Sequence, residues 1–382
     1  MKMKKRILVA TEFFPRTKEG DARGGVEIRS WQVAKRLAKQ YEIIVITSLE
    51  DSLPKEDIFF DIRVLRVGPR RRYTQKGALV KRILFMIGVY RKIIKLKPQL
   101  VDAQSIITYL PSFYAAKKLN IKSVMTCHDV WQGRWMKLFG FMGIIGEIFE
   151  RFYLKLPWNK FIANSQYTKN SLIKSGIDNN KIEVVHNGID FQLINSINVE
   201  QKNDFSVCSV TRLVDYKRVI DLLHAVALVK NKFPDVKCNI IGSGPELNNL
   251  KNAVKKLKIE LNVNFLGFVD EYREVISEIK KSNVFCLTST VEGFGIVIAE
   301  AMACGTPVVA TDISPIREVT KNGQGAILFK PKDVQALSKA IIKIFGDRQI
   351  ANDLSKKGKE ISLNYNWNNL AELTLKIYHD LI

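Results

Sequence analysis

The sequence predicts an α/β protein with two Rossmann-like domains, each built on a parallel β-sheet. Its 382 residues are enough for two domains, and 46% hydrophobic with 26% charged residues is the balance of a globular chain. Short apolar runs, typical of buried strands, alternate with longer amphipathic stretches, typical of helices. This alternation starts at Ile7 and begins again after residue 200, so the chain contains two such units.

The order of the elements supports this organisation. In the N-terminal half, an apolar run at residues 7–10, a helix at about 26–39 and a second run at 43–46 give strand, helix, strand. The C-terminal half repeats the pattern, with strands expected at 206–210, 238–241, 263–266, 284–287 and 308–310, and helices at about 219–232 and 247–258. Polar residues accumulate between Gln192 and Asp204, which is therefore the best linker candidate.

The cysteines and the N-terminus indicate a cellular compartment. Five scattered cysteines without a CxxC spacing argue against a disulfide framework or a zinc site and favour a reducing cytosol. The apolar run that ends at Ala10 is too short for a secretory signal. We therefore expect a cytoplasmic protein.

The charge of the chain is concentrated in one half. The net charge is +22, and residues 1–190 carry 35 Lys and Arg against 17 Asp and Glu, hence +18 of it. This asymmetry suggests that the N-terminal half meets a polyanion, either an acidic membrane surface, a phosphate-bearing substrate or nucleic acid. The alternative is a solvated, Lys-rich surface.

The stretch from Glu292 to Thr311 gives the clearest indication of a ligand-binding site. Gly293 and Gly295 permit a tight turn, and the apolar run that follows predicts a buried helix, whose N-terminus can bind an anion such as a diphosphate. Glu300 lies within this helix, where a carboxylate needs hydrogen-bond donors, and a ribose diol would supply two. The alternative is a plain turn, with Glu300 paired to an internal Arg or Lys.

The whole string resembles the signature of the retaining GT-B glycosyltransferases of glycosyltransferase family 4, and the resemblance extends over nearly the whole chain. It implies two Rossmann-like domains facing across a cleft. We expect an acceptor-binding domain at 1–195, a nucleotide-sugar-binding domain at 196–364, and a C-terminal helix over 365–382 that packs back on the first domain. Glu300 resembles the family's ribose-binding Glu, and Glu292 the Glu that faces the donor sugar. The turn whose amides hold sugar and phosphate corresponds to Phe294, Gly295 and Ile296.

Other family features follow in the expected order. Gly24 and Gly25, ahead of Glu27, resemble the glycine loop that closes over the donor diphosphate and borders the acceptor site, so Glu27 is assigned to the acceptor side. Arg212 and Lys217 resemble the basic pair that neutralises the leaving diphosphate. In isolation these residues would equally fit a plain strand-to-helix turn and ordinary surface charge.

Two further groups are carried over in the same way. The turn formed by Gly242, Ser243 and Gly244 resembles the family's turn near the base and ribose, although a structural βα turn is the alternative. His128 matches the His that hydrogen-bonds the donor sugar near the reaction centre, and Asp129 is assigned to the acceptor side. A lone His at the end of a strand is otherwise more often structural.

The sequence departs from the family pattern at several positions. Thr211 stands where many relatives have Gly, Lys217-Arg218 replaces Lys-Gly, Tyr41-Glu42 lacks the usual Gly-His, and residues 312–315 replace a Gly-Gly turn. None of these changes touches Glu292, Glu300 or the basic pair. They make the preference for a particular donor sugar harder to carry over.

Two segments of the basic half suggest a membrane surface. Residues 77–97 place apolar Leu79, Ile83 and Ile87 broadly on one helical face, and residues 131–158 mix aromatic with basic residues. The second segment is too interrupted to span a bilayer, which needs about 20 apolar residues. Both segments are either ordinary helices packed on the sheet or interfacial helices. The charge asymmetry favours a protein bound peripherally to the inner face of the cytoplasmic membrane.

The expected activity is therefore a retaining, metal-independent transfer of a sugar from a nucleotide sugar, most simply a UDP- or GDP-sugar, with no cofactor. The acceptor would be a lipid-linked or cell-surface glycan precursor. The residues assigned to catalysis are Glu292, His128, Arg212 and Lys217. The alternatives are an epimerase or phosphorylase of the same fold, and a basic nucleic-acid-binding protein without catalysis. The presence of both Glu and both cations disfavours the latter, so nucleic acid is not an expected partner.

Overall fold

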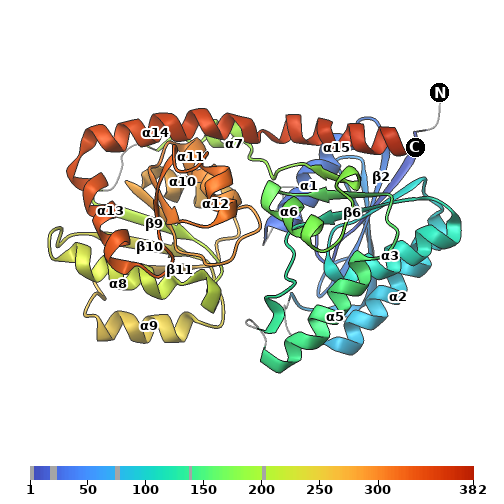
Figure 1. Cartoon of the computed structure of the whole chain (residues 1–382), viewed down its shortest axis with the longest axis horizontal. Helices are drawn as coiled ribbons and strands as arrows, with labels where there is room; N and C mark the ends of the chain where they lie inside the picture. Colours follow the sequence, from blue (N-terminus) through green and yellow to red (C-terminus); the bar gives the residue numbers. More distant parts are fainter. Residues whose placement is uncertain (1–3, 18–23, 74–77, 137–139, 200–203) are drawn as a thin grey trace. The chain divides into compact units, whose positions relative to one another are not determined.

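The computed structural model describes residues 4–17, 24–73, 78–136, 140–199 and 204–382. The chain forms two compact units (Figure 1). The first unit comprises Met1–Asn187 together with Trp367–Ile382, and the second comprises Gly188–Asn366. Each unit is an α/β domain with a largely parallel sheet, as the sequence predicts.

The sheet of the first unit has the strand order β3-β4-β2-β1-β5-β6-β7-β8 among the described residues. The short edge strand β3 runs antiparallel to β4, and every other pair is parallel. The central strand β1 is apolar and almost fully buried, as a strand covered on both faces must be. The strands are β1 (Arg6–Ala10), β2 (Glu42–Glu50), β3 (Glu56–Phe59), β4 (Ile62–Arg71), β5 (Leu100–Ala103), β6 (Lys122–Cys127), β7 (Lys160–Ala163) and β8 (Ile182–Val184).

Helices cover both faces of this sheet. On one face, Phe85, Val89 and Ile93 of α2 pack on strand residues such as Leu8 and Ile44. On the other, α15 lies against α1, and the hydroxyl of the buried Tyr378 donates a hydrogen bond of 2.5 Å to Asp102 on β5. The C-terminal helix is therefore part of the first unit. The helices are α1 (Gly25–Leu37), α2 (Leu79–Leu96), α3 (Ile106–Leu119), α5 (Gly143–Leu154), α6 (Gln166–Lys174) and α15 (Trp367–Leu381), with short 3-10 turns η1 (Gly140–Met142) and η2 (Asn179–Lys181).

The sheet of the second unit has the order β11-β10-β9-β12-β13-β14, with every pair parallel. Its strands are β9 (Ser206–Val210), β10 (Lys237–Ile241), β11 (Val263–Gly267), β12 (Val284–Leu287), β13 (Val308–Thr311) and β14 (Ala326–Phe329). The strand order reverses between β9 and β12, and ligands of open α/β sheets bind outside the carboxyl ends of the strands at such a point.

Helices surround this second sheet as well. They are α7 (Phe191–Ser196), α8 (Val219–Lys230), α9 (Leu247–Lys256), α10 (Tyr272–Lys281), α11 (Ile296–Cys304), α12 (Ser314–Val319), α13 (Val334–Gly346) and α14 (Arg348–Ser362), with 3-10 turns η3 (Asp215–Lys217) and η4 (Leu363–Tyr365). The segment 192–204, the linker candidate of the sequence, begins inside α7. Ile189, Ile194 and Ile197 pack into the core of the second unit, so the chain divides after Asn187 rather than at residue 195.

Candidate active site

An ion pair joins the loops that follow β9 and β12, the two strands at the reversal of the second sheet. Lys217 ends the turn η3 after β9, and Glu292 follows β12. The Lys217 ammonium donates to the Glu292 carboxylate at 2.5 Å, and each side chain is only 12% exposed. The structure thus brings together two residues that the sequence assigned to catalysis.

Hydrogen bonds to the main chain hold this turn in place. The Thr288 hydroxyl donates to the carbonyl of Lys217 at 2.8 Å, and the amide and hydroxyl of Thr290 both donate to the carbonyl of Tyr216, at 2.8 and 3.0 Å. An ammonium carries three donor hydrogens, so Lys217 can bind a phosphate oxygen while keeping Glu292. The exposed Arg212 lies in the same loop and donates to the Tyr216 hydroxyl at 2.8 Å.

Glu300 is buried in helix α11, where the sequence placed the ribose-binding carboxylate. It accepts a hydrogen bond of 2.7 Å from the Tyr272 hydroxyl, and no ion pair joins it to an Arg or Lys of the described residues. Burial raises the pKa of Glu300 to about 7, although the Tyr272 hydrogen bond acts in the opposite direction. The internal Arg or Lys partner considered for Glu300 is therefore not what the structure shows.

Glycines shape two turns of the second unit for different reasons. A Cβ on Gly242 would lie 1.8 Å from the Thr211 carbonyl oxygen, and one on Gly244 would lie 2.2 Å from that of Leu213. These glycines are thus required by the protein's own backbone, and they let Leu213 N–H donate to the Ser243 carbonyl at 2.9 Å. Gly295 instead adopts a φ of +90° directly ahead of α11, a conformation that favours glycine.

The residues on either side of Gly295 fix the start of α11 on the core of the second unit. The Phe294 side chain is buried in the core of the second unit, with its ring 5.3 Å from that of Tyr365. Ile296 begins α11. Because α11 starts here, its first amides and the positive end of its dipole lie at this turn, beside the loop that carries Glu292.

The family's Lys-Gly pattern has a structural explanation at Arg218. This residue has a φ of +52°, a left-handed conformation that costs a non-glycine residue roughly 1–2 kcal/mol. Its guanidinium makes two hydrogen bonds to the buried Asp221, at 2.6 and 3.0 Å. This paired contact offsets the backbone cost and explains how Arg replaces Gly at this position.

In the first unit, His128 directly follows strand β6. Its Nε2 is buried and has no hydrogen-bond partner among the residues that the structure describes. Burial, with a smaller effect of the nearby Arg29 charge, lowers the pKa of His128 to about 3. The imidazole is therefore neutral at physiological pH.

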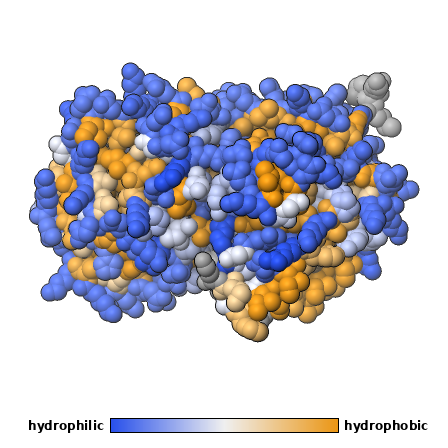
Figure 2. Space-filling view, viewed as in Figure 1, coloured by the Kyte–Doolittle hydropathy of each residue, from blue (hydrophilic) through white to orange (hydrophobic). Residues whose placement is uncertain are grey.

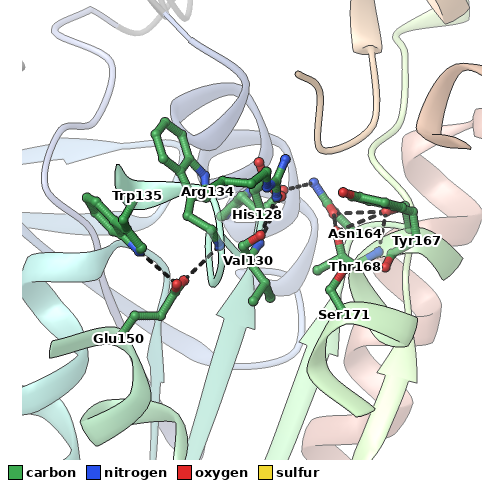
Figure 3. Close-up of polar contacts among 12 residues, drawn as sticks. His128, Val130, Arg134, Trp135, Glu150, Asn164, Tyr167, Thr168 and Ser171 are labelled. Atoms are coloured by element: carbon green, nitrogen blue, oxygen red, sulfur yellow. Dashed lines mark hydrogen bonds and ion pairs between the residues drawn. The ribbon is translucent and has the colours of Figure 1, made fainter. Parts of the chain in front are cut away.

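The main chain at His128 is fixed by a polar group that the sequence did not single out (Figure 3). The Asn164 amide nitrogen donates to the His128 carbonyl at 2.8 Å, while the Asn164 side-chain oxygen accepts from the Thr168 hydroxyl at 2.8 Å. Asn164 directly follows β7, which pairs with β6. Its position after a strand was the only signal in the sequence, and many structural residues share it.

Asp129 is paired rather than open to solvent. Its carboxylate accepts from the Arg134 guanidinium at 2.7 Å and from the Val130 amide at 2.8 Å. Burial raises the pKa of Asp129 to about 6 in spite of Arg134. The buried Glu150 of α5 holds the same segment, because it accepts from the Trp131 amide at 3.0 Å and from the Trp135 indole at 2.8 Å (Figure 3).

Arg29 anchors the end of the first unit. This buried guanidinium donates to the carbonyls of Val185 and His186, at 2.7 and 2.8 Å, and to the Asn187 side-chain oxygen at 3.1 Å. Burial lowers the pKa of Arg29 to about 10, while the charge of Asp102 acts against this shift. Its neighbour Glu27, assigned to the acceptor side, is buried in the first turn of α1.

The glycines at the start of α1 differ from those of the second unit. A Cβ on Gly25 would meet no atom within 4 Å, and one on Gly24 would meet only the Tyr73 hydroxyl, at 3.8 Å. Gly24 has a φ of −170°, which any residue can adopt. The described part of the chain therefore does not itself require glycine at these two positions.

Helices α2 and α5 expose much apolar surface. α2 buries Phe85, Val89 and Ile93, whereas Leu79, Ile83 and Ile87, which the sequence placed on one apolar face, are exposed by 71, 47 and 41%. Figure 2 shows the hydrophobic area over α2 and α5. The other large exposed apolar side chains of this region are Val80, Leu84, Met136, Phe141, Ile145, Ile148 and Phe152. No helix among the described residues is long and apolar enough to cross a membrane.

Comparisons with known proteins define the class. Anabaena HepE, in a crystal structure with UDP and glucose, superposes with a TM-score of 0.78 at 21% identity, over 99% of this chain and 100% of its own. Sucrose-phosphate synthase from Thermosynechococcus elongatus superposes with a TM-score of 0.84 at 20% identity, over 99% of both chains. The fold is GT-B, and the fold class predicted from the sequence is confirmed.

Sequence comparisons give the family. The model described as "Glycosyltransferase Family 4" matches residues 23–193, and "Glycosyl transferases group 1" matches residues 190–361. An uncharacterised glycosyltransferase of Haemophilus influenzae is 25% identical over 91% of this chain and 94% of its own length. The chain belongs to the GT-B glycosyltransferases of family 4, and the resemblance seen in the string from Glu292 to Thr311 is confirmed.

The raised pKa of Glu300 gives a prediction for stability. The Glu300 carboxyl has a pKa of 4.5 in the unfolded chain and about 7 in the folded one. Between these pH values the unfolded chain has lost the proton and the folded chain still holds it, so the free energy of unfolding falls as the pH rises through this window. Glu300→Gln removes the penalty and should stabilise the ligand-free protein at pH 8 by about 3 kcal/mol, and by almost nothing near pH 4.5. Urea titrations at both pH values measure this. The exposed Glu360→Gln serves as control, and a pH-independent effect of Glu300→Gln would contradict the assignment.

Proposed function

We propose that the protein transfers a sugar, with retention of anomeric configuration and without a metal ion, from a UDP- or GDP-sugar to a lipid-linked or cell-surface glycan precursor. The observation that carries this proposal is the Lys217–Glu292 pair at the reversal of the second sheet. It places a cation and a carboxylate beside the start of α11 and in the same unit as the buried Glu300. Family membership supports both the donor class and the retaining course.

The residues of the second unit suit a donor of this kind. Glu300 accepts from Tyr272 and, when ionised, can also accept from a ribose diol. Lys217, Arg212 and the start of α11 together oppose the charge that develops on a leaving diphosphate. This kind of electrostatic stabilisation is usually the largest contribution to catalysis. Protein cations would then perform the task that a metal ion performs in other transferases.

In the first unit, the neutral His128 offers an unpaired ring nitrogen to the donor sugar. Asp129 and Glu27 line the acceptor side in this proposal. Arg29, Asn164 and Glu150 act through other residues, because they hold the main chain before Gly188, at His128 and at Trp131. They are positioning residues rather than catalytic ones.

The donor assignment is tested by binding. A panel of UDP-, GDP- and ADP-sugars should raise the melting temperature for the correct nucleotide, because a ligand that binds only the folded state stabilises it. Lys217→Met should lower the affinity for that nucleotide sugar about tenfold or more, as the loss of a charge-assisted contact does. Lys339→Met, on α13 of the same unit, should leave the affinity unchanged. If no sugar nucleotide shifts the melting temperature, the donor assignment is wrong.

The open space at Gly25 gives a second test, in which stability and activity change in opposite directions. Gly25→Ala should stabilise the protein by up to about 1 kcal/mol, because alanine favours a helix over glycine and the methyl group meets no protein atom. The same methyl group should slow nucleotide release from the donor at least tenfold if the donor diphosphate approaches this backbone. Gly346→Ala, equally open and in the second unit, is the control and should not affect release. If Gly25→Ala releases the nucleotide at the wild-type rate, the glycine loop is not part of the donor site.

The exposed helices of the first unit support membrane binding. At roughly 1.5–3 kcal/mol for each fully buried aliphatic side chain, seating even half of the apolar residues of α2 and α5 in a bilayer is worth several kcal/mol. Exposed Lys81, Arg91 and Lys95 of α2 would meet anionic headgroups. The exposed residues are mostly aliphatic, and a single-stranded nucleic acid would instead require stacking aromatics.

Flotation with vesicles of phosphatidylglycerol and phosphatidylethanolamine tests this surface. Wild type should float, less so at high salt, and Ile83→Ser combined with Ile148→Ser should lose most of the binding because apolar contact is removed. Leu261→Ser in the second unit, where the leucine is 85% exposed, is the matched control and should float like wild type. Equal flotation of all three proteins, or none, would contradict the membrane proposal.

A further inference from the structure

A cavity of about 460 Å³ lies in the first unit, outside the donor-binding residues described above. It opens between the end of β4 and the first turn of α2, and its volume is in the range that small-molecule ligands occupy. The lining residues are Asp51, Arg71, Arg72, Ala78, Leu79, Val80 and Lys81. Three cations thus face one carboxylate, which gives the lining a net charge of +2.

The floor of this cavity is rigid. The Arg71 side chain is 1% exposed and donates to Glu12 at 2.9 Å and to the Ser48 hydroxyl at 2.5 Å. The same guanidinium lies 4.7 Å from the Phe13 ring and 5.3 Å from the Phe85 ring. These contacts hold the Arg71 guanidinium in position.

The wall of the cavity is easier to rearrange. The Arg72 side chain is 91% exposed, and its ion pair with Asp51, at 3.6 Å, joins two exposed groups. Such pairs contribute little, so a phosphate can displace Asp51 from Arg72 at small cost. Lys81 donates to the Arg70 carbonyl at 3.0 Å and keeps further donor hydrogens for a ligand. Both side chains can thus close on an anion.

A series of side-chain contacts connects the cavity to Gly24. Arg71 stacks on Phe13, the Phe13 ring lies 4.6 Å from the Tyr73 ring, and the Tyr73 hydroxyl is 3.8 Å from the position of a Cβ on Gly24. A ligand in the cavity would therefore be separated from Gly24 by three side chains, those of Arg71, Phe13 and Tyr73. This places it on the acceptor side of the proposed reaction.

The outer edge of the cavity is apolar. Leu79 and Val80, exposed by 71 and 69%, line the cavity and also begin the exposed apolar stripe of α2 that continues through Ile83, Leu84 and Ile87. A ligand that fits both parts has an anionic head and a hydrocarbon tail. A free phosphate would use only the cations, and an uncharged lipid only the stripe.

We propose that this cavity binds the phosphate or diphosphate head of an amphiphilic acceptor, with the hydrocarbon chain leaving along the α2 stripe. This inference rests on the proposed glycosyl transfer, since it names where that reaction's acceptor is held. Arg72 and Lys81 close on the head, and Arg71 fixes the floor. These three cations would hold the phosphate head of the acceptor, while its sugar or hydroxyl extends towards Gly24.

Binding of farnesyl diphosphate, a soluble probe with both features, tests the inference. Titrations are run with saturating UDP, or the nucleotide that the panel selects, so that the donor's diphosphate site is already filled. Wild type should bind farnesyl diphosphate at least tenfold more tightly than inorganic diphosphate or farnesol. Arg72→Ala combined with Lys81→Ala should weaken farnesyl diphosphate about tenfold or more, as loss of charge-assisted contacts does.

Matched variants separate this site from a general effect of charge. Lys117→Ala combined with Lys118→Ala, which removes two charges from α3 in the same unit, should leave the affinity unchanged. Leu79→Ser combined with Val80→Ser should weaken farnesyl diphosphate but not inorganic diphosphate. Equal affinity in wild type and the Arg72/Lys81 variant, or an equal loss in the Lys117/Lys118 variant, overturns the inference. Failure of every nucleotide to bind would instead overturn the proposed function, and leave the result for farnesyl diphosphate to stand by itself.

Discussion

The candidate site depends on the ion pair between Lys217 and Glu292. Each partner is 12% exposed, and a pair this deep adds little net stability, although removing one partner alone is costly. The ion pair therefore matters because it fixes the positions of the two side chains, not because it stabilises the fold. It fixes an ammonium and a carboxylate where β9 and β12 part, which is the place where an open parallel sheet binds ligands. Thr288 and Thr290 hold the main chain of the turn that ends at Lys217.

Much of the second unit could be predicted from the sequence. Its strands are apolar runs flanked by polar loops, and Arg212 and the turn at Gly242 lie close after strands, where ligands of open α/β sheets bind. Glu150, Asn164 and Arg29 could not be found in this way, because their partners are distant in sequence or are main-chain groups. The direction in which the apolar face of α2 points was left open by the sequence, and the structure shows Leu79, Ile83 and Ile87 exposed. Apolar residues surround much of this helix, and periodicity alone does not tell which of them face the core.

The two units make different use of buried charge. In the second unit, Glu300 is buried with a single tyrosine partner and a raised pKa, which leaves it able to accept further hydrogen bonds. In the first unit, several buried charged groups are instead satisfied by neutral polar groups, as Asp102 is by Tyr378, Gln104 and Thr126. The first unit also contains the buried Nε2 of His128, the open glycines of α1, a cationic cavity and an apolar surface, which the proposals above assign to ligands.

The central claim is that protein cations, rather than a metal ion, stabilise the diphosphate as it leaves the sugar. The acceptor then takes the face of the sugar that the diphosphate leaves, so that the anomeric configuration is retained. Proton NMR of the transfer reaction, run in excess EDTA, tests it most directly, because the anomeric signal reports both the rate and the stereochemistry. The account predicts that product forms at the same rate with and without EDTA, and that the transferred sugar keeps the anomeric configuration of the donor. A product of inverted configuration, or a reaction that stops in EDTA and resumes with added magnesium or manganese, would contradict it.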